Sequence, residues 1–410
     1  MSNHLDSAIK EINLHAVVRG YWTFDVETFP ALKKAIYERT QSDKKMLDTL
    51  RREVISFSEE VRTIKPYSAN AVSLVASDGG NNQLSFDPFY VQLVRVTDSY
   101  GKNLCVDAVS PSTDTDELGK AQFNSNGTPI TALGWMMKDL GVDNPPHLSR
   151  LSPMIPKGSD IRDHPDSVKP GWLSTYRDLC EWAVLYERIC YTTFATDTLI
   201  VRDGLLRSVI FAGDLFIKWR KNVENVMDRI YREDHRRVYL VGIAKHSKVI
   251  TRYQLAMAIE NVFPSGDARY VRIPRDLEAK AYIWNEYARG AEAEGKDIGV
   301  PRFVAGDMFL VRFGSMDGDP IWAVDIFSKQ SYDASEIFGY LLNDAINGFP
   351  VPFYPRCLQK AHEYAQIVDF DLEIFQDNVF EAVRDLLPTE KKNIIDGWKF
   401  RSDLSMRRYG

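Results

Sequence analysis

The sequence predicts an α/β protein in which a mixed β-sheet is flanked by helices. Three observations favour this fold class. Short β-branched segments follow one another between residues 71 and 109, which is typical of an antiparallel meander. Segments with helical spacing then alternate with short apolar strands as far as residue 244. Apolar residues make up 44% and charged residues 26% of the chain, which is the composition of a folded globular protein.

A helical extension, residues 1–66, is predicted at the N-terminus. Apolar residues recur there at helical spacing among many charges between residues 31 and 64. Pro30 suits the start of a helix, and Pro66 follows its end. A helix that packs against its own protein and one that binds a partner have the same spacing, so both roles stay open.

The central region, residues 67–370, is predicted to contain the sheet. Its first strand is expected to run into a tight turn at Ser77-Asp78-Gly79-Gly80. Further strands are predicted at 89–96, 103–109, 198–201 and 238–244, with helices at 171–194 and 214–232. Three antiparallel strands followed by helix, strand, helix and strand is the order of a ribonuclease-H-like mixed sheet.

The rest of the chain is expected to elaborate this sheet. Residues 110–170 are rich in Ser, Thr, Asp, Gly and Pro, which predicts an insertion or long loop with one short helix near 132–140. Residues 371–410 are predicted to be a tail with a short helix. Other expected elements are a helix at 251–262, strands at 308–313 and 320–327, and a helix at 357–367.

Bulk properties narrow the class of protein. The net charge of −6 counts against extensive electrostatic wrapping of nucleic acid but allows a local basic channel. The four cysteines show no C-x-x-C spacing, so a structural zinc site is not predicted. No apolar run reaches 18 residues, and the first eleven residues carry no secretory pattern. We therefore expect no membrane span and a reducing, cytoplasmic location.

Asp78 and Asp203 share the same local context. Each closes an apolar strand and is followed directly by glycine. If the two strands are neighbours, both carboxylates emerge at one edge of the sheet. Two such carboxylates, with a third from a helix, form an all-oxygen site for Mg²⁺ or Mn²⁺. An Asp-Gly pair after a strand is also the usual way to form a turn, so each motif alone has a structural explanation.

The helix before the Asp203 strand offers two candidates for the third carboxylate, Glu181 and Glu187. Glu181 lies nearer the start of this helix. A helix antiparallel to the strand would put Glu181 nearer the sheet edge that carries Asp78, so Glu181 is favoured. An exposed acidic residue on a charged helix face remains the alternative for both.

A basic cluster on the following helix, Lys218, Arg220 and Lys221, surrounds Trp219. Such a mixture can hold phosphates and stack on bases. The alternative is a solvated helix face with Trp219 turned into the core.

Four motifs resemble the NurA nuclease family and occur in the family's order. They are Val75–Gly80, Leu199–Leu206, Val241–Ser247 and Tyr354–His362, and they span roughly residues 70–370. The resemblance implies a ribonuclease-H-like fold and Mn²⁺- or Mg²⁺-dependent cleavage of DNA. It also implies a homodimer and a HerA-type hexameric ATPase, a DNA translocase, as partner.

By position, the resemblance assigns Asp78, Glu181 and Asp203 as metal ligands, with His362 completing the site. Lys245 would contact phosphate or position the nucleophile. A lone histidine on an amphipathic helix is ordinarily structural, and only its place in the Ala-His element favours a role for His362. Lys245 could equally be a solvated charge at a strand end.

The predicted function is divalent-metal-dependent hydrolysis of phosphodiester bonds at DNA ends. A non-catalytic adaptor that docks on a hexameric translocase is the main alternative, although such an adaptor has no need of carboxylates at strand ends. A metal phosphohydrolase acting on nucleotides is a third possibility. A Mn²⁺-dependent nuclease assay separates the first two, and competition between single-stranded DNA and nucleotides tests the third.

Overall fold

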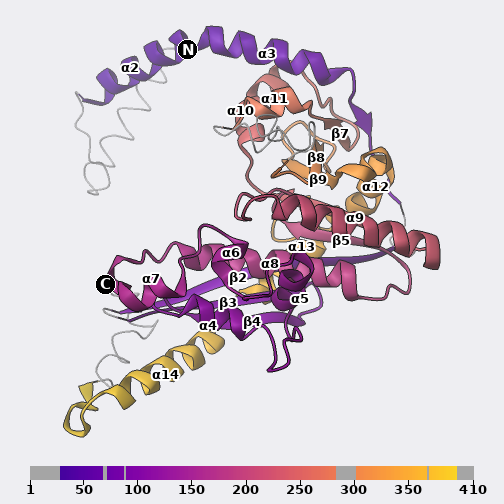
Figure 1. The fold of residues 1–410 in the computed structure, drawn as a ribbon. Helices are drawn as coiled ribbons and strands as arrows, with labels where there is room; N and C mark the ends of the chain where they lie inside the picture. The colour runs from indigo at the N-terminus through magenta and orange to yellow at the C-terminus, as the bar shows by residue number, and fades with distance from the viewer. Residues whose placement is uncertain (1–27, 68–71, 87–88, 283–301, 367–368, 395–410) are drawn as a thin grey trace. The chain divides into compact units, whose positions relative to one another are not determined.

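The computed structural model describes residues 28–67, 72–86, 89–282, 302–366 and 369–394 (Figure 1). The chain divides into two compact units, one of residues 1–56 with 253–262 and one of residues 57–252 with 263–410. None of the helices in the described ranges combines the length and apolarity that crossing a membrane requires.

The smaller unit contains α2 (Thr28–Ser42), most of α3 (Lys44–Ser58) and the second half of α10 (Lys248–Ile259). Two helices therefore occupy the region where the sequence predicts one. Arg51 on α3 forms an ion pair with Glu260, and the Tyr253 hydroxyl lies 3.0 Å from a carboxylate oxygen of Glu53. These polar contacts tie α3 to the α10 segment.

The larger unit is built on one nine-stranded sheet with the order β1-β7-β8-β9-β6-β5-β2-β3-β4. β2, β3 and β4 form the predicted antiparallel meander, and β5 and β6 run parallel to β2. This half of the sheet is the ribonuclease-H-like arrangement that the sequence predicts, and β9, β8, β7 and β1 extend it by antiparallel pairing. The strands are β1 (Arg62–Thr63), β2 (Val72–Phe86), β3 (Phe89–Asp98), β4 (Asn103–Val109), β5 (Asp197–Asp203), β6 (Val238–Ala244), β7 (Arg269–Arg272), β8 (Gly306–Arg312) and β9 (Ile321–Phe327).

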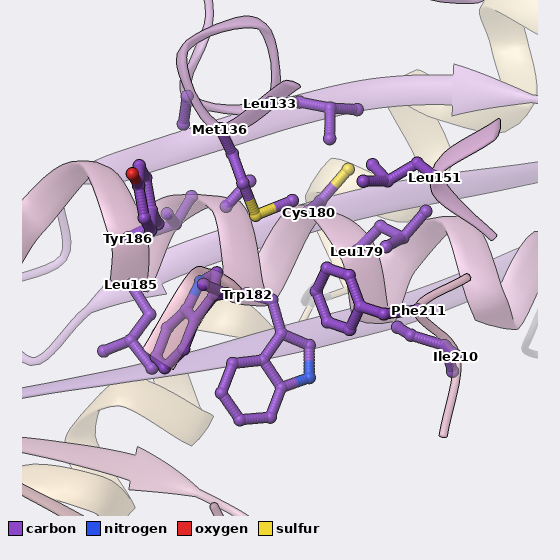
Figure 2. Packing of buried hydrophobic residues seen from close by; sticks show 14 of the residues in the cluster. Leu133, Met136, Leu151, Leu179, Cys180, Trp182, Leu185, Tyr186, Ile210 and Phe211 are labelled. Atoms are coloured by element: carbon purple, nitrogen blue, oxygen red, sulfur yellow. The ribbon is translucent and has the colours of Figure 1, made fainter. Parts of the chain in front are cut away.

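Helices cover both faces of this sheet, and each face has its own apolar core. α5 (Ala132–Leu140), α8 (Trp172–Tyr191) and α9 (Leu215–Asp234) share one core with Ile200 of β5. Figure 2 shows part of this core around α8, including Trp182, Cys180 and Phe211. α12 (Ala334–Ala345) and α13 (Arg356–Ala365) share the other core with Val201. We call these the α8 face and the α13 face.

Residues 110–170 contain the predicted helix at 132–140, which is α5, but the rest of the segment also forms helices in place of the predicted long loop. They form α4 (Thr115–Lys120), α5, α6 (Leu148–Leu151), α7 (Gly158–Asp163) and the 3₁₀ helix η2 (Pro165–Ser167). Two of the polar residues that indicated a loop are N-caps. The Asp114 carboxylate accepts from the amides of residues 116 and 117, and the Thr131 hydroxyl accepts from Gly134. The polar composition therefore reflects short capped helices.

β2 also differs from its prediction, because the strand continues through Asp78-Gly79-Gly80 to Phe86 and forms no turn there. Its pairing with β3 extends from Ser77 to Phe86 without interruption. Asp78 therefore lies inside β2, beside the point where β5 ends. The remaining elements are α11 (Arg275–Ala279), η4 (Ser328–Asp333), α14 (Asp369–Leu386) and η5 (Thr389–Lys391).

Candidate metal site

Asp78 and Asp203 lie side by side on the α13 face. The parallel register between β2 and β5 brings the two residues level with each other at the end of β5. Side chains alternate between the faces of a sheet, and Ala76 and Val201, each two residues earlier, belong to the core of the α13 face. The expectation that two strands distant in sequence carry their carboxylates to one edge is therefore met.

α13 brings His362 to the same edge. Its Nδ1 lies 2.6 Å from Oδ2 of Asp78, and the Gln366 amide nitrogen lies 2.8 Å from its Nε2. Asp78, Asp203 and His362 each offer one ligand atom, and these atoms lie within 4.8 Å of one another. Two carboxylate oxygens and an imidazole nitrogen are donors that suit Mn²⁺, so the residues present fit a divalent cation.

Asp203 has two further polar neighbours. Lys245, just beyond β6, places its Nζ 2.9 Å from Oδ2, and the Tyr354 hydroxyl lies 3.3 Å from Oδ1. Burial, followed by the charge of Asp203, raises the pKa of Tyr354 well above its usual value, so this hydroxyl remains a donor. The structure thus brings Lys245 into direct contact with Asp203, one of the two carboxylates. His246, the next residue, lines a separate pocket together with Arg202.

The carboxylates of Asp78 and Asp203 repel each other when no cation is bound. Burial raises the pKa of Asp78, and the charge of Asp203 raises it further. The hydrogen bonds from His362 and from the Gly79 amide act in the opposite direction but do not cancel these effects. A divalent cation between the two carboxylates would offset their repulsion.

Glu181 approaches from the opposite side of the sheet. It belongs to α8, and its carboxylate fills the space that a Cβ on Gly79 would need. Its oxygens lie 3.4 Å from Nε of Arg177 and 3.2 Å from Nη2 of Arg202, and Glu181 is outside the set of three converging ligands. Between the two predicted candidates, Glu181 is the one that reaches the Asp-Gly segment. Glu187 lies six residues, or about 9 Å, further along the helix.

Glu181 should make the stability of the protein depend on pH. Burial raises its pKa from 4.5 to about 7, although Arg202 and Arg177 oppose the shift. The folded state then holds the proton more tightly than the unfolded state, so Glu181 contributes stability below pH 4.5 that is lost as pH rises through 7. We expect the unfolding free energy of the wild type to fall relative to Glu181→Gln by roughly 1–3 kcal/mol across this window. Urea denaturation of both proteins at several pH values measures this difference. Unfolding free energies that change in parallel with pH in the wild type and in Glu181→Gln would contradict the prediction.

Gly79 and Gly80 serve close packing on both faces. A Cβ on Gly79 would overlap the Glu181 carboxylate, and one on Gly80 would overlap the backbone carbonyl of Ala365 in α13. We expect Gly79→Ala and Gly80→Ala each to destabilise the protein by about 1–3 kcal/mol in thermal melts. Combining Gly79→Ala with Glu181→Ala should remove most of the first penalty. Gly80→Ala should keep its full cost when combined with Glu181→Ala. If Glu181→Ala relieved both glycine substitutions equally, the overlap of the Gly79 Cβ with Glu181 would not be the cause of the loss.

The turn after Asp203 follows the sequence prediction. Gly204 has φ +107°, a conformation that favours glycine, and its amide donates to the carbonyl of Ile243 at 2.8 Å. The next residues are anchored by Asp325 on β9, which accepts from the amide of Leu206 at 3.0 Å. Asp203 thus lies at the start of a firmly held loop.

The basic cluster on α9 is not a base-stacking site. Trp219 is fully buried and packs against Trp182 and Phe216 in the core of the α8 face. Arg220 donates to the carbonyl of Val304 at 3.2 Å. The packing alternative for Trp219 is therefore correct.

The sequence alone predicts no role at the site for three of its residues, Arg177, Arg202 and Tyr354. Arg177 and Arg202 hold Glu181, and Arg202 also lies over the Trp182 ring at 4.5 Å from its centre. The only available signal for Arg202 was its place beside Asp203, which does not reveal a partner on α8. Tyr354 begins the Tyr354–His362 motif, and its place in that motif is the sequence feature that marks it.

The fold and the site together define a class: an α/β protein with a ribonuclease-H-like mixed sheet and a candidate carboxylate–histidine metal site beside the end of β5. The structure is similar to those of NurA nucleases. The crystal structure of the NurA nuclease from Sulfolobus solfataricus is 14% identical, with a TM-score of 0.41 and coverage of 89% of this chain and 99% of that one. NurA bound to dAMP and manganese is 12% identical, with a TM-score of 0.36 and coverage of 88% and 99%.

No protein-family model matches this sequence, and no curated protein matches it. Because the identities and TM-scores of the structural neighbours are low, the function proposed below rests on the residues of the site.

Proposed function

We propose that this protein is a divalent-metal-dependent deoxyribonuclease that hydrolyses phosphodiester bonds at DNA ends. The observation that carries the proposal is the convergence of Asp78, Asp203 and His362 from three separate elements on one sheet edge. A Mn²⁺ or Mg²⁺ ion bound there would supply a Lewis acid that polarises the phosphodiester and activates water.

The residues around this set have complementary proposed roles. Asp78 and Asp203 hold the cation, with His362 as the nitrogen ligand. Tyr354 orients Asp203 through its hydroxyl group. Lys245 places a positive charge next to the carboxylates, where it can bind the phosphate undergoing hydrolysis or position the nucleophile.

Glu181 is proposed as the third carboxylate of the site. Because Gly79 has no side chain, the Glu181 carboxylate lies against the backbone next to Asp78. To bind the cation, it would exchange its contacts with Arg177 and Arg202 for a contact with the metal. The stronger positive charge of a divalent ion favours that exchange.

The support for the proposed partners is the resemblance of the four sequence motifs, because the geometry of the site does not bear on them. The motif resemblance supports a homodimer that works with a HerA-type hexameric translocase on DNA in end resection or DNA defence. The proposed cytoplasmic location comes from the cysteine pattern.

The proposal is tested by incubating the purified protein with end-labelled single- and double-stranded DNA. We expect the labelled strands to become shorter in Mn²⁺ or Mg²⁺ and to keep their length in EDTA. Intact DNA at every metal concentration would contradict a nuclease and favour an adaptor. Hydrolysis of free nucleotides with DNA left intact would favour a nucleotide phosphohydrolase.

A further inference from the structure

A pocket of about 660 Å³ adjoins the metal-ligand cluster on the α13 face. Lys245 and His362 line it, so the pocket opens directly onto the cluster. Its other walls come from the loop at 347–351 and from the exposed side of α13. Its size is in the range of pockets that hold small ligands such as a nucleotide.

The pocket carries an excess of positive charge. Arg356 and Lys360, one helical turn apart on α13, are exposed and line it together with Lys245. Among the residues that the structure describes, neither Arg356 nor Lys360 has a carboxylate within ion-pair distance, and Glu363 is the one acidic residue in the lining. Free cations of this kind bind phosphate oxygens.

An aromatic ring lies at the same pocket. Phe349 is 84% exposed, although burying an aromatic ring is strongly favourable. An unpaired nucleobase can stack on such a ring irrespective of its sequence. The pocket therefore combines a stacking surface with phosphate-binding cations.

We propose that this pocket binds the nucleotide next to the scissile phosphodiester, with its phosphates on Arg356 and Lys360 and its base stacked on Phe349. The inference rests on the proposed nuclease function, which it extends to the path of the strand. His362 belongs to both the pocket and the ligand cluster, so a strand held by the pocket continues into the site.

Fluorescence anisotropy with a labelled single-stranded oligonucleotide in EDTA tests binding apart from metal-dependent cleavage. The double variant Arg356→Gln, Lys360→Gln should bind at least about tenfold more weakly. It should also lower the slope of log affinity against log salt by about 1.4, since two phosphate contacts are lost. Phe349→Ala should weaken binding by about 5- to 100-fold and leave that slope unchanged.

Matched controls come from the opposite edge of the sheet. Tyr332 is also 84% exposed, and Arg236 is exposed just before β6 begins, so Tyr332→Ala and Arg236→Gln should bind like the wild type. If the pocket variants bind like these controls while the wild type binds and cuts DNA, the pocket inference is wrong and the nuclease function stands. If the wild type neither binds nor cuts DNA, both are overturned.

Discussion

Replacing Asp78 or Asp203 by asparagine is expected to lower Mn²⁺-dependent DNA cleavage by about 1,000-fold or more. Loss of a carboxylate ligand removes several kcal/mol of transition-state stabilisation, and each 1.4 kcal/mol is a tenfold change in rate. The measurement is the single-turnover cleavage rate at saturating protein. Asp385→Asn, at a carboxylate that is 84% exposed on α14, is the control and should cleave like the wild type.

The same variants should have a second effect that separates loss of function from loss of fold. Burial and Asp203 raise the pKa of Asp78, so its ionised form is unfavourable in the folded, metal-free protein at neutral pH. Asp78→Asn should therefore melt at the same or a higher temperature than the wild type in EDTA. Mn²⁺ should raise the melting temperature of the wild type but not that of Asp78→Asn. Full cleavage by Asp78→Asn would remove the basis of the proposed site.

Removing Arg207 is expected to produce the largest loss of stability. Its guanidinium forms two hydrogen bonds with Asp325, at 2.7 and 2.6 Å, and an ion pair with Glu278. The Arg207 side chain is 1% exposed and both carboxylates are fully buried. Arg207→Met would leave the buried Asp325 carboxylate without its cation, and Glu278 would keep only its ion pair with Arg275. Leaving a buried charge without its partner costs about 3–5 kcal/mol.

Chemical denaturation measures this cost, and the exposed Arg232→Met on α9 is the control, with an expected change below about 0.5 kcal/mol. Asp325 also accepts from the amide of Leu206, so the loop after Asp203 should loosen in Arg207→Met. We therefore expect slower cleavage even at temperatures where Arg207→Met remains folded. A loss of less than about 1 kcal/mol would show that the buried ions are compensated in another way.

The order of the central elements could be predicted because strands and helices that bury one face have distinct apolar periods. β6 matches its prediction at both ends, and α8 and α9 match theirs closely. Within residues 110–170 the helix at 132–140 could be predicted and is α5. α4, α6 and α7 could not, since they have only six, four and six residues and lie in sequence with the composition of a loop. The course of β2 past Asp78 was missed because Asp-Gly-Gly usually forms a turn, whereas pairing with β3 keeps it extended.

The site was predictable in part for a similar reason. Parallel neighbouring strands bring Asp78 and Asp203 to one edge, and strand alternation gives both carboxylates the same face. The environment of Glu181 depends on how α8 is rotated and on Arg177 and Arg202, which local spacing does not specify. Long-range contacts of this kind, like that of Tyr354 with Asp203, arise only from packing.

The most direct test of the central claim is anomalous diffraction from crystals soaked in Mn²⁺. We expect a manganese peak bonded to carboxylate oxygens of both Asp78 and Asp203, at about 2.0–2.2 Å, with His362 beside it. Crystals of Asp203→Asn should lose the peak under the same soak. A fully occupied manganese ion elsewhere in the protein, with none between these two carboxylates, would contradict the account.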